Sequence, residues 1–150
     1  MIKKLLNKLI GNESTTPSVV SFRDGLKLTG LPIVCLNQGN KTFNFILDTG
    51  SDVSVLAEHV LSEIEHEKVK VKGTLYGIDG NKIPVKVVSI ALSYEDVSFT
   101  SNFLVRNLQE AFNHLKKDHG VTVHGMLGSK FFNEYKYIID FNKLIAYSVS

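Results

Sequence analysis

The sequence of 150 residues has one cysteine, three prolines and no tryptophan. A single cysteine, Cys35, cannot form a disulfide within the chain, which excludes a disulfide scaffold and favours a reducing compartment such as the cytoplasm. No stretch approaches the roughly 18 apolar residues of a spanning helix, so we expect no transmembrane segment. Lys and Arg number 17 against 15 Asp and Glu, and this small excess argues against a nucleic-acid partner.

The residues that are present favour a folded domain. Hydrophobic residues make up 43% and charged residues 21% of the chain, the balance of a soluble globular protein. A chain of this length buries roughly two-thirds of its unfolded surface, so it needs no metal or cofactor to fold.

The first residues have a different pattern. Residues 1–11 predict an amphipathic N-terminal helical arm, which lacks the small-residue cleavage site of a secretion signal. We expect its apolar face to dock on its own domain or a partner subunit, with an anionic membrane surface as the alternative. Residues 12–22 predict a polar linker, and residues 23–150 the folded domain. The apolar face of the arm consists of Ile2, Leu5, Leu6, Leu9 and Ile10.

Beyond the arm, short strands dominate. Two hairpins are predicted, one from residues 31–36 and 42–47 and one that ends the chain over 137–147. Further strands are indicated by alternating residues at 68–72, 82–87 and 97–105, and helical patterns occur only at 56–65, 108–117 and 131–135. The sequence therefore predicts a mainly-β, barrel-like domain with one or two short helices.

One segment contains candidate catalytic residues. Asp48, Thr49 and Gly50 follow directly after the apolar strand 42–47, and Ser51 comes next. A carboxylate at the end of a buried strand, in a tight turn held by glycine, is rigid and surrounded by backbone donors, as catalytic carboxylates are. The alternative is an aspartate that only caps a β-turn.

At these residues the sequence resembles the retropepsin-like aspartic proteases. The resemblance begins at Ile46 and Leu47 before the Asp-Thr-Gly triplet, continues through a glycine-containing segment like the family's flap, and ends in an apolar-apolar-Gly segment, 126–128, before a short helix. It covers about residues 23–150 and implies a closed β-barrel with one lobe per chain. The flap segment comprises Tyr76, Gly77, Ile78, Asp79 and Gly80.

Two features depart from the family pattern. Retroviral members carry an arginine after the apolar-apolar-Gly segment, paired with an aspartate; here Asp52 is present but Ser129 replaces the arginine, so we expect that ion pair to be absent. Residues 108–117 also predict an inserted helix.

The resemblance implies peptide hydrolysis by two carboxyls that share one proton. The chain has one such carboxylate, because Asp118 and Asp140 lack the surrounding hydroxyl and glycine, so the second must come from Asp48 of another copy in a homodimer. Thr49 would brace the paired loops, Gly50 would contact water and substrate, and Ser51 would bond an outer carboxylate oxygen. Gly128 would support the site, and the flap would cover an extended peptide.

Other functions have less support. A catalytically silent domain that binds peptides or dimerises remains the alternative, since a fold does not guarantee its chemistry. The histidines at 114, 119 and 124 do not share a helix face, so no metal site is predicted. Cys35, within an apolar strand, is interpreted as a core residue rather than a reactive thiol.

Overall fold

The structure is a computed structural model that describes residues 19–71, 75–76 and 79–148. The predicted arm, most of the linker, and Gly77 and Ile78 of the predicted flap lie outside these residues. Residues 19–21 of the expected linker form a strand, and Phe22 is fully buried.

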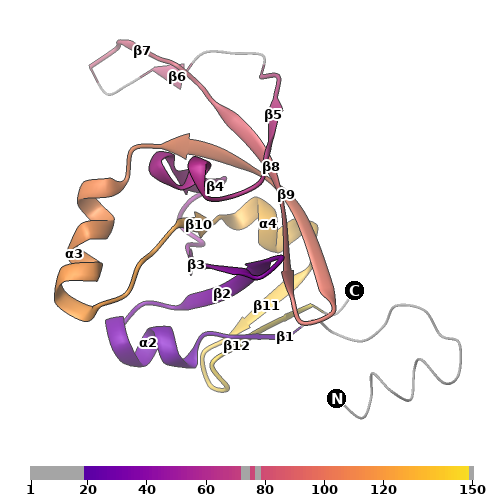
Figure 1. The fold of residues 1–150 in the computed structure, drawn as a ribbon. Coiled ribbons are helices and arrows are strands. Elements are labelled where there is room, and N and C mark those ends of the chain that lie inside the picture. Colours follow the sequence, from indigo (N-terminus) through magenta and orange to yellow (C-terminus); the bar gives the residue numbers. More distant parts are fainter. Residues whose placement is uncertain (1–18, 72–74, 77–78, 149–150) are drawn as a thin grey trace, which may run out of the picture.

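Six strands close into a barrel, as predicted. They are hydrogen-bonded in the order β2-β3-β10-β4-β9-β8, and β2 pairs with β8 at Asn37 and Ser93 to complete the circle (Figure 1). A seventh strand, β5, extends the sheet beside β8. In chain order the strands are β2 (Ile33–Gln38), β3 (Lys41–Leu47), β4 (Ser54–Ala57), β5 (Glu67–Val69), β8 (Val87–Tyr94), β9 (Val97–Arg106) and β10 (Gly125–Leu127).

Side chains fill the barrel. Along β3 the buried residues are Phe43, Phe45 and Leu47, the alternation expected when one face of a strand meets the core. Phe45 packs against Phe103 of β9 at a ring-centroid distance of 5.6 Å, so aromatic residues from opposite parts of the barrel meet. The strand that leads to Asp48 is therefore anchored in the core.

The two ends of the described chain form a second sheet, ordered β1-β12-β11. The predicted C-terminal hairpin is present, and Asp140 accepts bonds from the backbone N–H groups of Asn142 and Lys143 at its turn. Asp140 is thus a turn residue, as its sequence position suggested. The strands are β1 (Val19–Ser21), β11 (Tyr137–Asp140) and β12 (Ile145–Ser148).

Helices cover parts of the barrel. The predicted helices at 108–117 and 131–135 are confirmed as α3 (Gln109–His119) and α4 (Ser129–Glu134). The pattern at 56–65 is instead the end of β4 followed by a 3₁₀ turn, η1 (Glu58–Ser62). Helix α2 (Arg23–Thr29) was not predicted because Gly25 weakens its helix propensity. Gly25 is needed there, since a Cβ would lie 2.5 Å from Cβ of Ile33.

A short hairpin of β6 (Leu75–Tyr76) and β7 (Lys82–Ile83) projects beyond the barrel at the top of Figure 1. Its two strands pair only with each other. It lies where the sequence predicts the flap.

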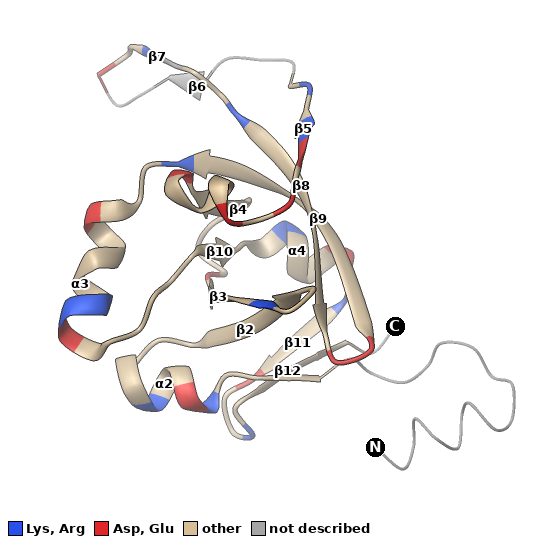
Figure 2. Ribbon diagram, viewed as in Figure 1, with Lys and Arg blue, Asp and Glu red and all other residues tan. Residues whose placement is uncertain are grey.

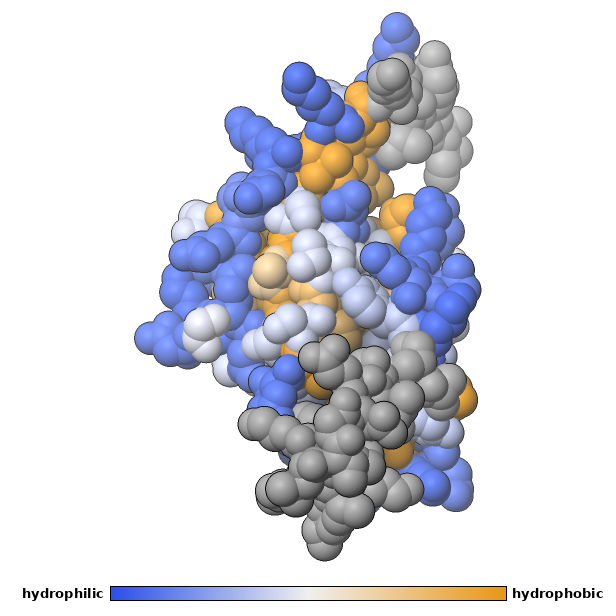
Figure 3. All heavy atoms as spheres, turned by 90° about the vertical axis from the view of Figure 1, so that its right-hand side faces the viewer, coloured by the Kyte–Doolittle hydropathy of each residue, from blue (hydrophilic) through white to orange (hydrophobic). Residues whose placement is uncertain are grey.

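The described part of the surface, in the views of Figures 2 and 3, carries mixed charges and scattered apolar areas. Acidic and basic residues are interspersed over the helices and hairpin tips (Figure 2), and the apolar areas in Figure 3 are separate patches between hydrophilic side chains. Within the described residues, no helix is long and apolar enough to cross a membrane.

Candidate active site

Asp48 lies in the turn that joins β3 to β4, residues 48–53. We call it the catalytic turn because it holds the aspartate that the sequence predicts to be catalytic. Strand β10 is inserted between β3 and β4, parallel to the first and antiparallel to the second. The turn must therefore cross the end of β10. This crossing explains how residues near 128 come to contact the Asp-Thr-Gly triplet.

Backbone hydrogen bonds join the turn to the chain after β10. The N–H of Asp48 donates to the carbonyl of Leu127 at 2.9 Å, and the N–H of Ser129 donates to the carbonyl of Ser51 at 2.8 Å. These bonds hold the turn on both sides of the triplet. The backbone from which the half-buried Asp48 side chain extends is therefore fixed in place.

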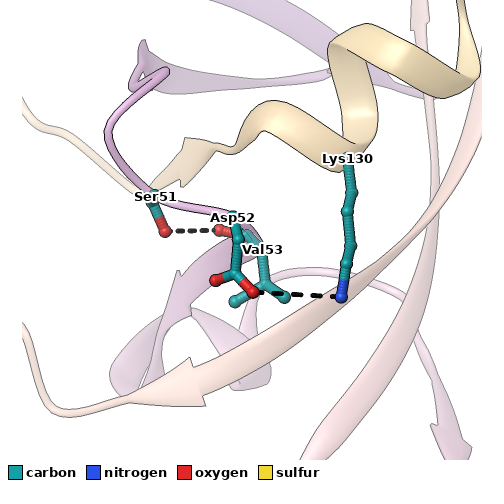
Figure 4. A network of polar contacts seen from close by, with 4 residues as sticks. All are labelled: Ser51, Asp52, Val53 and Lys130. Atoms are coloured by element: carbon teal, nitrogen blue, oxygen red, sulfur yellow. Dashed lines mark hydrogen bonds and ion pairs between the residues drawn. The ribbon is translucent and has the colours of Figure 1, made fainter.

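One side chain and a further backbone hydrogen bond strengthen the same junction. Ser129 donates its hydroxyl to the carbonyl of Thr49 at 2.8 Å, and the N–H of Lys130 donates to the carbonyl of Asp52 at 3.0 Å. Ser129 thus has a bracing role at the position of the missing arginine. Lys130 Nζ lies 4.0 Å from Asp52 Oδ2 (Figure 4), so a long, exposed ion pair exists one residue further along than the family pattern.

Inside the turn, one hydrogen bond holds the Asp48 carboxylate and another holds the backbone of the turn. The N–H of Gly50 donates to Oδ1 of Asp48 at 3.1 Å. The Ser51 hydroxyl donates to the carbonyl of Val53 at 2.8 Å (Figure 4). In the single chain the Ser51 proton is therefore used within the turn, and its bond to Asp48 stays a prediction.

Gly128 permits the close crossing of the two segments. A Cβ at this position would lie 2.4 Å from the carbonyl carbon and oxygen of Val53. Its N–H donates to the buried Ser54 hydroxyl oxygen at 3.1 Å. Because the obstacle is backbone, no side-chain rotation can relieve it, so glycine is required by space.

The predicted flap is described in part. Tyr76 lies in β6, and Asp79 and Gly80 form an exposed turn before β7. Asp79 accepts bonds from the backbone N–H and side-chain amide of Asn81, and these bonds lower the pKa of the carboxyl. Gly80 has φ of +79°, a conformation that favours glycine.

One residue differs from its interpretation in the sequence. Cys35 lies on the outer face of β2 and is exposed, so its prediction as a core residue is wrong. Desolvation of its thiol raises its pKa, which disfavours the reactive thiolate. No group of three or more potential metal ligands occurs within the described part of the chain.

His124 has a structural role that the sequence did not indicate. Its Nδ1 accepts a bond from the N–H of Asn44 at 2.9 Å, and its ring contacts Phe43 edge-on. Its backbone N–H donates to Asn44 and its carbonyl accepts from Ala57. His124 therefore connects β3 to the segment that enters β10.

Comparison with known proteins shows which family the chain matches. A family model described as "Aspartyl protease" matches residues 33–131, two-thirds of the chain, including Asp48 and Gly128. Among solved structures, the chain is similar to a retropepsin-like aspartic protease from Rickettsia conorii, with 15% sequence identity and a TM-score of 0.44 over 89% of this chain and 91% of the other. No curated protein gives a significant match.

Proposed function

The chain belongs to the aspartyl protease family, and from this premise we propose that it is an aspartic endopeptidase that hydrolyses peptide bonds as a homodimer. The observation that supports this most strongly is the catalytic turn, in which Asp48 is held by bonds from Gly50 and to Leu127. A carboxylate held in this way is already oriented for the reaction, so little free energy is needed to reorient it in the transition state.

The number of suitable carboxylates supports the dimer. Asp118 lies exposed on α3 and Asp140 is used by its hairpin turn, so Asp48 is the only aspartate of these three in the catalytic turn. Hydrolysis by this route needs two facing carboxyls. A two-fold axis that brings Asp48 against its own copy supplies the second one.

In the proposed mechanism the ionised carboxylate takes a proton from water, and the resulting hydroxide attacks the scissile carbonyl carbon. The protonated carboxyl donates a hydrogen bond to the carbonyl oxygen, which gains negative charge as the tetrahedral intermediate forms. A proton then passes to the leaving nitrogen, the C–N bond breaks, and the two carboxyls again share one proton.

The other predicted residues position this chemistry. Exposed Thr49 is available to brace the partner's turn, and Gly50 gives substrate and water access to backbone groups. The β6–β7 hairpin would cover an extended peptide, whose backbone adds to the hairpin as a strand.

The direct test is Asp48→Asn, assayed on an unstructured protein at about pH 5. An amide is nearly isosteric with a carboxyl but cannot exchange the proton, so cleavage should be abolished while circular dichroism and association state stay unchanged. The matched variant Asp118→Asn should cleave like wild type. Appreciable activity in Asp48→Asn would remove Asp48 from the mechanism.

The shared site is tested by mixing wild type with a ninefold excess of Asp48→Asn under subunit exchange. Random pairing leaves about a tenth of wild-type chains in intact homodimers, so activity per wild-type chain should fall about tenfold. An equal excess of Asp118→Asn should add activity. Activity that depends only on the amount of wild type would exclude a shared site. Wild type that binds peptides without cleaving them would be a catalytically silent domain.

A further inference from the structure

A cavity of about 320 Å³ lies beside the catalytic turn. One wall is the end of the turn with the start of β4, a second is β9, and a third is α4. No step of the proposed mechanism uses it. Its lining includes Val53 and Ser54, residues 100–102, and Lys130, Phe131 and Glu134.

The cavity results from small residues at inward positions. Along β9, Phe99 and Phe103 are buried, and Ser101 lies between them on the same side of the strand. Ser54, paired with Phe103, is the matching small residue of β4. Large apolar side chains at these two positions would fill the space. The sequence instead leaves a hollow lined by hydroxyl groups.

Strand pairing opens the cavity to one side. Strand β4 pairs with β9 only over residues 103–106, so it does not extend beside residues 100–102. The Tyr135 hydroxyl contacts both the N–H and the carbonyl of Thr100, at 2.9 and 2.5 Å, and a side chain thus replaces a neighbouring strand there.

The charges around the cavity are unequal. Lys130 extends from α4 toward Asp52 (Figure 4), and both side chains are mostly exposed. Glu134 lies one helical turn after Lys130 and has no ion-pair partner among the described residues. The two charged residues of the lining are Lys130 and Glu134. Lys130 is paired with Asp52, which lies outside the lining, so the unpaired charge that an occupant meets is the negative charge of Glu134, which favours a cation.

We propose that this cavity is a subsite that binds a basic side chain, lysine or arginine, of an extended peptide substrate. The inference rests on the proposed function. Val53 lies five positions after Asp48 in the chain, a span of at most about 18 Å. Because an extended peptide advances about 3.4 Å per residue, the basic residue should lie within about five positions of the scissile bond.

The lining suits both parts of a basic side chain. The cationic end can donate to the Glu134 carboxylate and to the oxygens of Ser101 and Asn102, while the aliphatic stem lies against Phe131. Lys130 would stay directed toward Asp52, which limits its repulsion of the incoming cation.

The first experiment measures kcat/KM for peptides with Arg, Gln or Glu at each of five positions on either side of the cleaved bond. Wild type should prefer Arg to Glu at one position, mainly through KM, by about threefold to fivefold, the effect of an exposed ion pair. Glu134→Gln should weaken this preference and Glu134→Lys should reverse it. Glu110→Gln, an exposed glutamate on α3, is the matched control. A preference unchanged in Glu134→Lys would overturn the proposal.

The second experiment fills the cavity. Ser101→Leu should abolish the preference for Arg over Glu at that position. Ser98→Leu, on the same strand but facing outward, should keep the preference. If both variants retain it, the cavity is not the subsite.

Binding separates this proposal from the proposed function. Fluorescence anisotropy of labelled Arg and Glu peptides with Asp48→Asn measures the subsite without cleavage. If Asp48→Asn binds the Arg peptide more tightly than the Glu peptide while the wild type cleaves neither, the subsite is sustained and the protease is refuted. Cleavage by wild type without any difference between the peptides would sustain the protease and refute the subsite, and absence of both binding and cleavage would refute both.

Discussion

The catalytic turn and the β6–β7 hairpin use glycine for opposite reasons. At Gly128, beside the turn, a Cβ would lie 2.4 Å from the Val53 backbone, although φ is an ordinary −94°. At Gly80, in the hairpin, nothing lies within 4 Å of a Cβ, but φ is +79°. One glycine is required by crowding and the other by conformation.

This difference follows from how each region is held. The turn is bonded to residues 127–130 through backbone and side chains, whereas the hairpin strands pair only with each other. A region with many constraints can hold a catalytic group in place, and a region with few can move to admit a peptide. The predictions below test this contrast.

The largest effect is expected from Gly128→Ala. The new methyl group overlaps backbone that cannot rotate away, so the free energy of unfolding should fall by about 3 kcal/mol. For a chain of this size the melting temperature should fall by about 6–12 °C, and activity should be lost with it. Thermal denaturation and peptide cleavage measure both.

Gly50→Ala is the control within the turn. Its Cβ would lie 3.2 Å from Oδ1 of Asp48, and this side chain can adjust. Its melting temperature should stay close to that of wild type. Equal destabilisation by the two variants would show that the crossing at Gly128 is not specially crowded.

A smaller effect is expected from Gly80→Ala. The positive φ imposes about 1 kcal/mol of strain on alanine, but the hairpin contributes no strand to the barrel. Peptide turnover should therefore fall about threefold to tenfold with little change in melting temperature. Gly39→Ala, at φ of +60° in the turn between β2 and β3, carries similar strain far from the predicted flap. It should keep its turnover, and an equal loss in both would contradict the role of the hairpin.

Much of the fold could be predicted because its signals are local. Alternating apolar residues at 42–47 and 97–105 identified β3 and β9. The position of Asp48 through Gly50 directly after an apolar strand identified the turn. The family model then confirmed the predicted aspartic protease family.

The rest depends on contacts between distant segments. Cys35 faces outward because barrel closure decides which side of β2 is covered, and an apolar run does not encode that choice. Lys130 reaches Asp52 because β10 is inserted between β3 and β4, a topology with no local signature. Ser54 and Ser101 form one cavity only once β4 and β9 are paired.

His124 should make the stability of the barrel depend on pH. It connects β3 to the segment that enters β10, the strand beside the catalytic turn. Burial lowers its pKa below the ordinary value of 6.5, opposed by Glu63 and assisted by His59, both on or beside η1. The folded state thus binds the proton less tightly than the unfolded state. Its contribution to stability should be complete above about pH 6.5, decline as the pH falls toward the lowered pKa, and level off below it.

Urea denaturation at several pH values, with His124→Phe beside wild type, measures this contribution. The phenylalanine keeps an aromatic ring near Phe43 but cannot titrate, so its stability should fall less between pH 7 and 5 than that of wild type. His114→Phe, an exposed position on α3, is the control. Parallel pH dependence in wild type and His124→Phe would place the titration elsewhere.

The smallest effect, and the finest test of the catalytic turn, is expected from Ser51→Ala. Loss of the hydroxyl removes the donor to the Val53 carbonyl, so the free energy of unfolding should fall by about 1 kcal/mol. If the hydroxyl turns to Asp48 when two chains assemble, its loss should also lower kcat for peptide cleavage, because the carboxylate is then held less firmly. We expect both changes, and Ser51→Thr, which keeps the hydroxyl, should behave like wild type. A fall in stability with an unchanged kcat would make Ser51 a brace of the turn alone, while no fall in stability would show that the bond to Val53 contributes nothing.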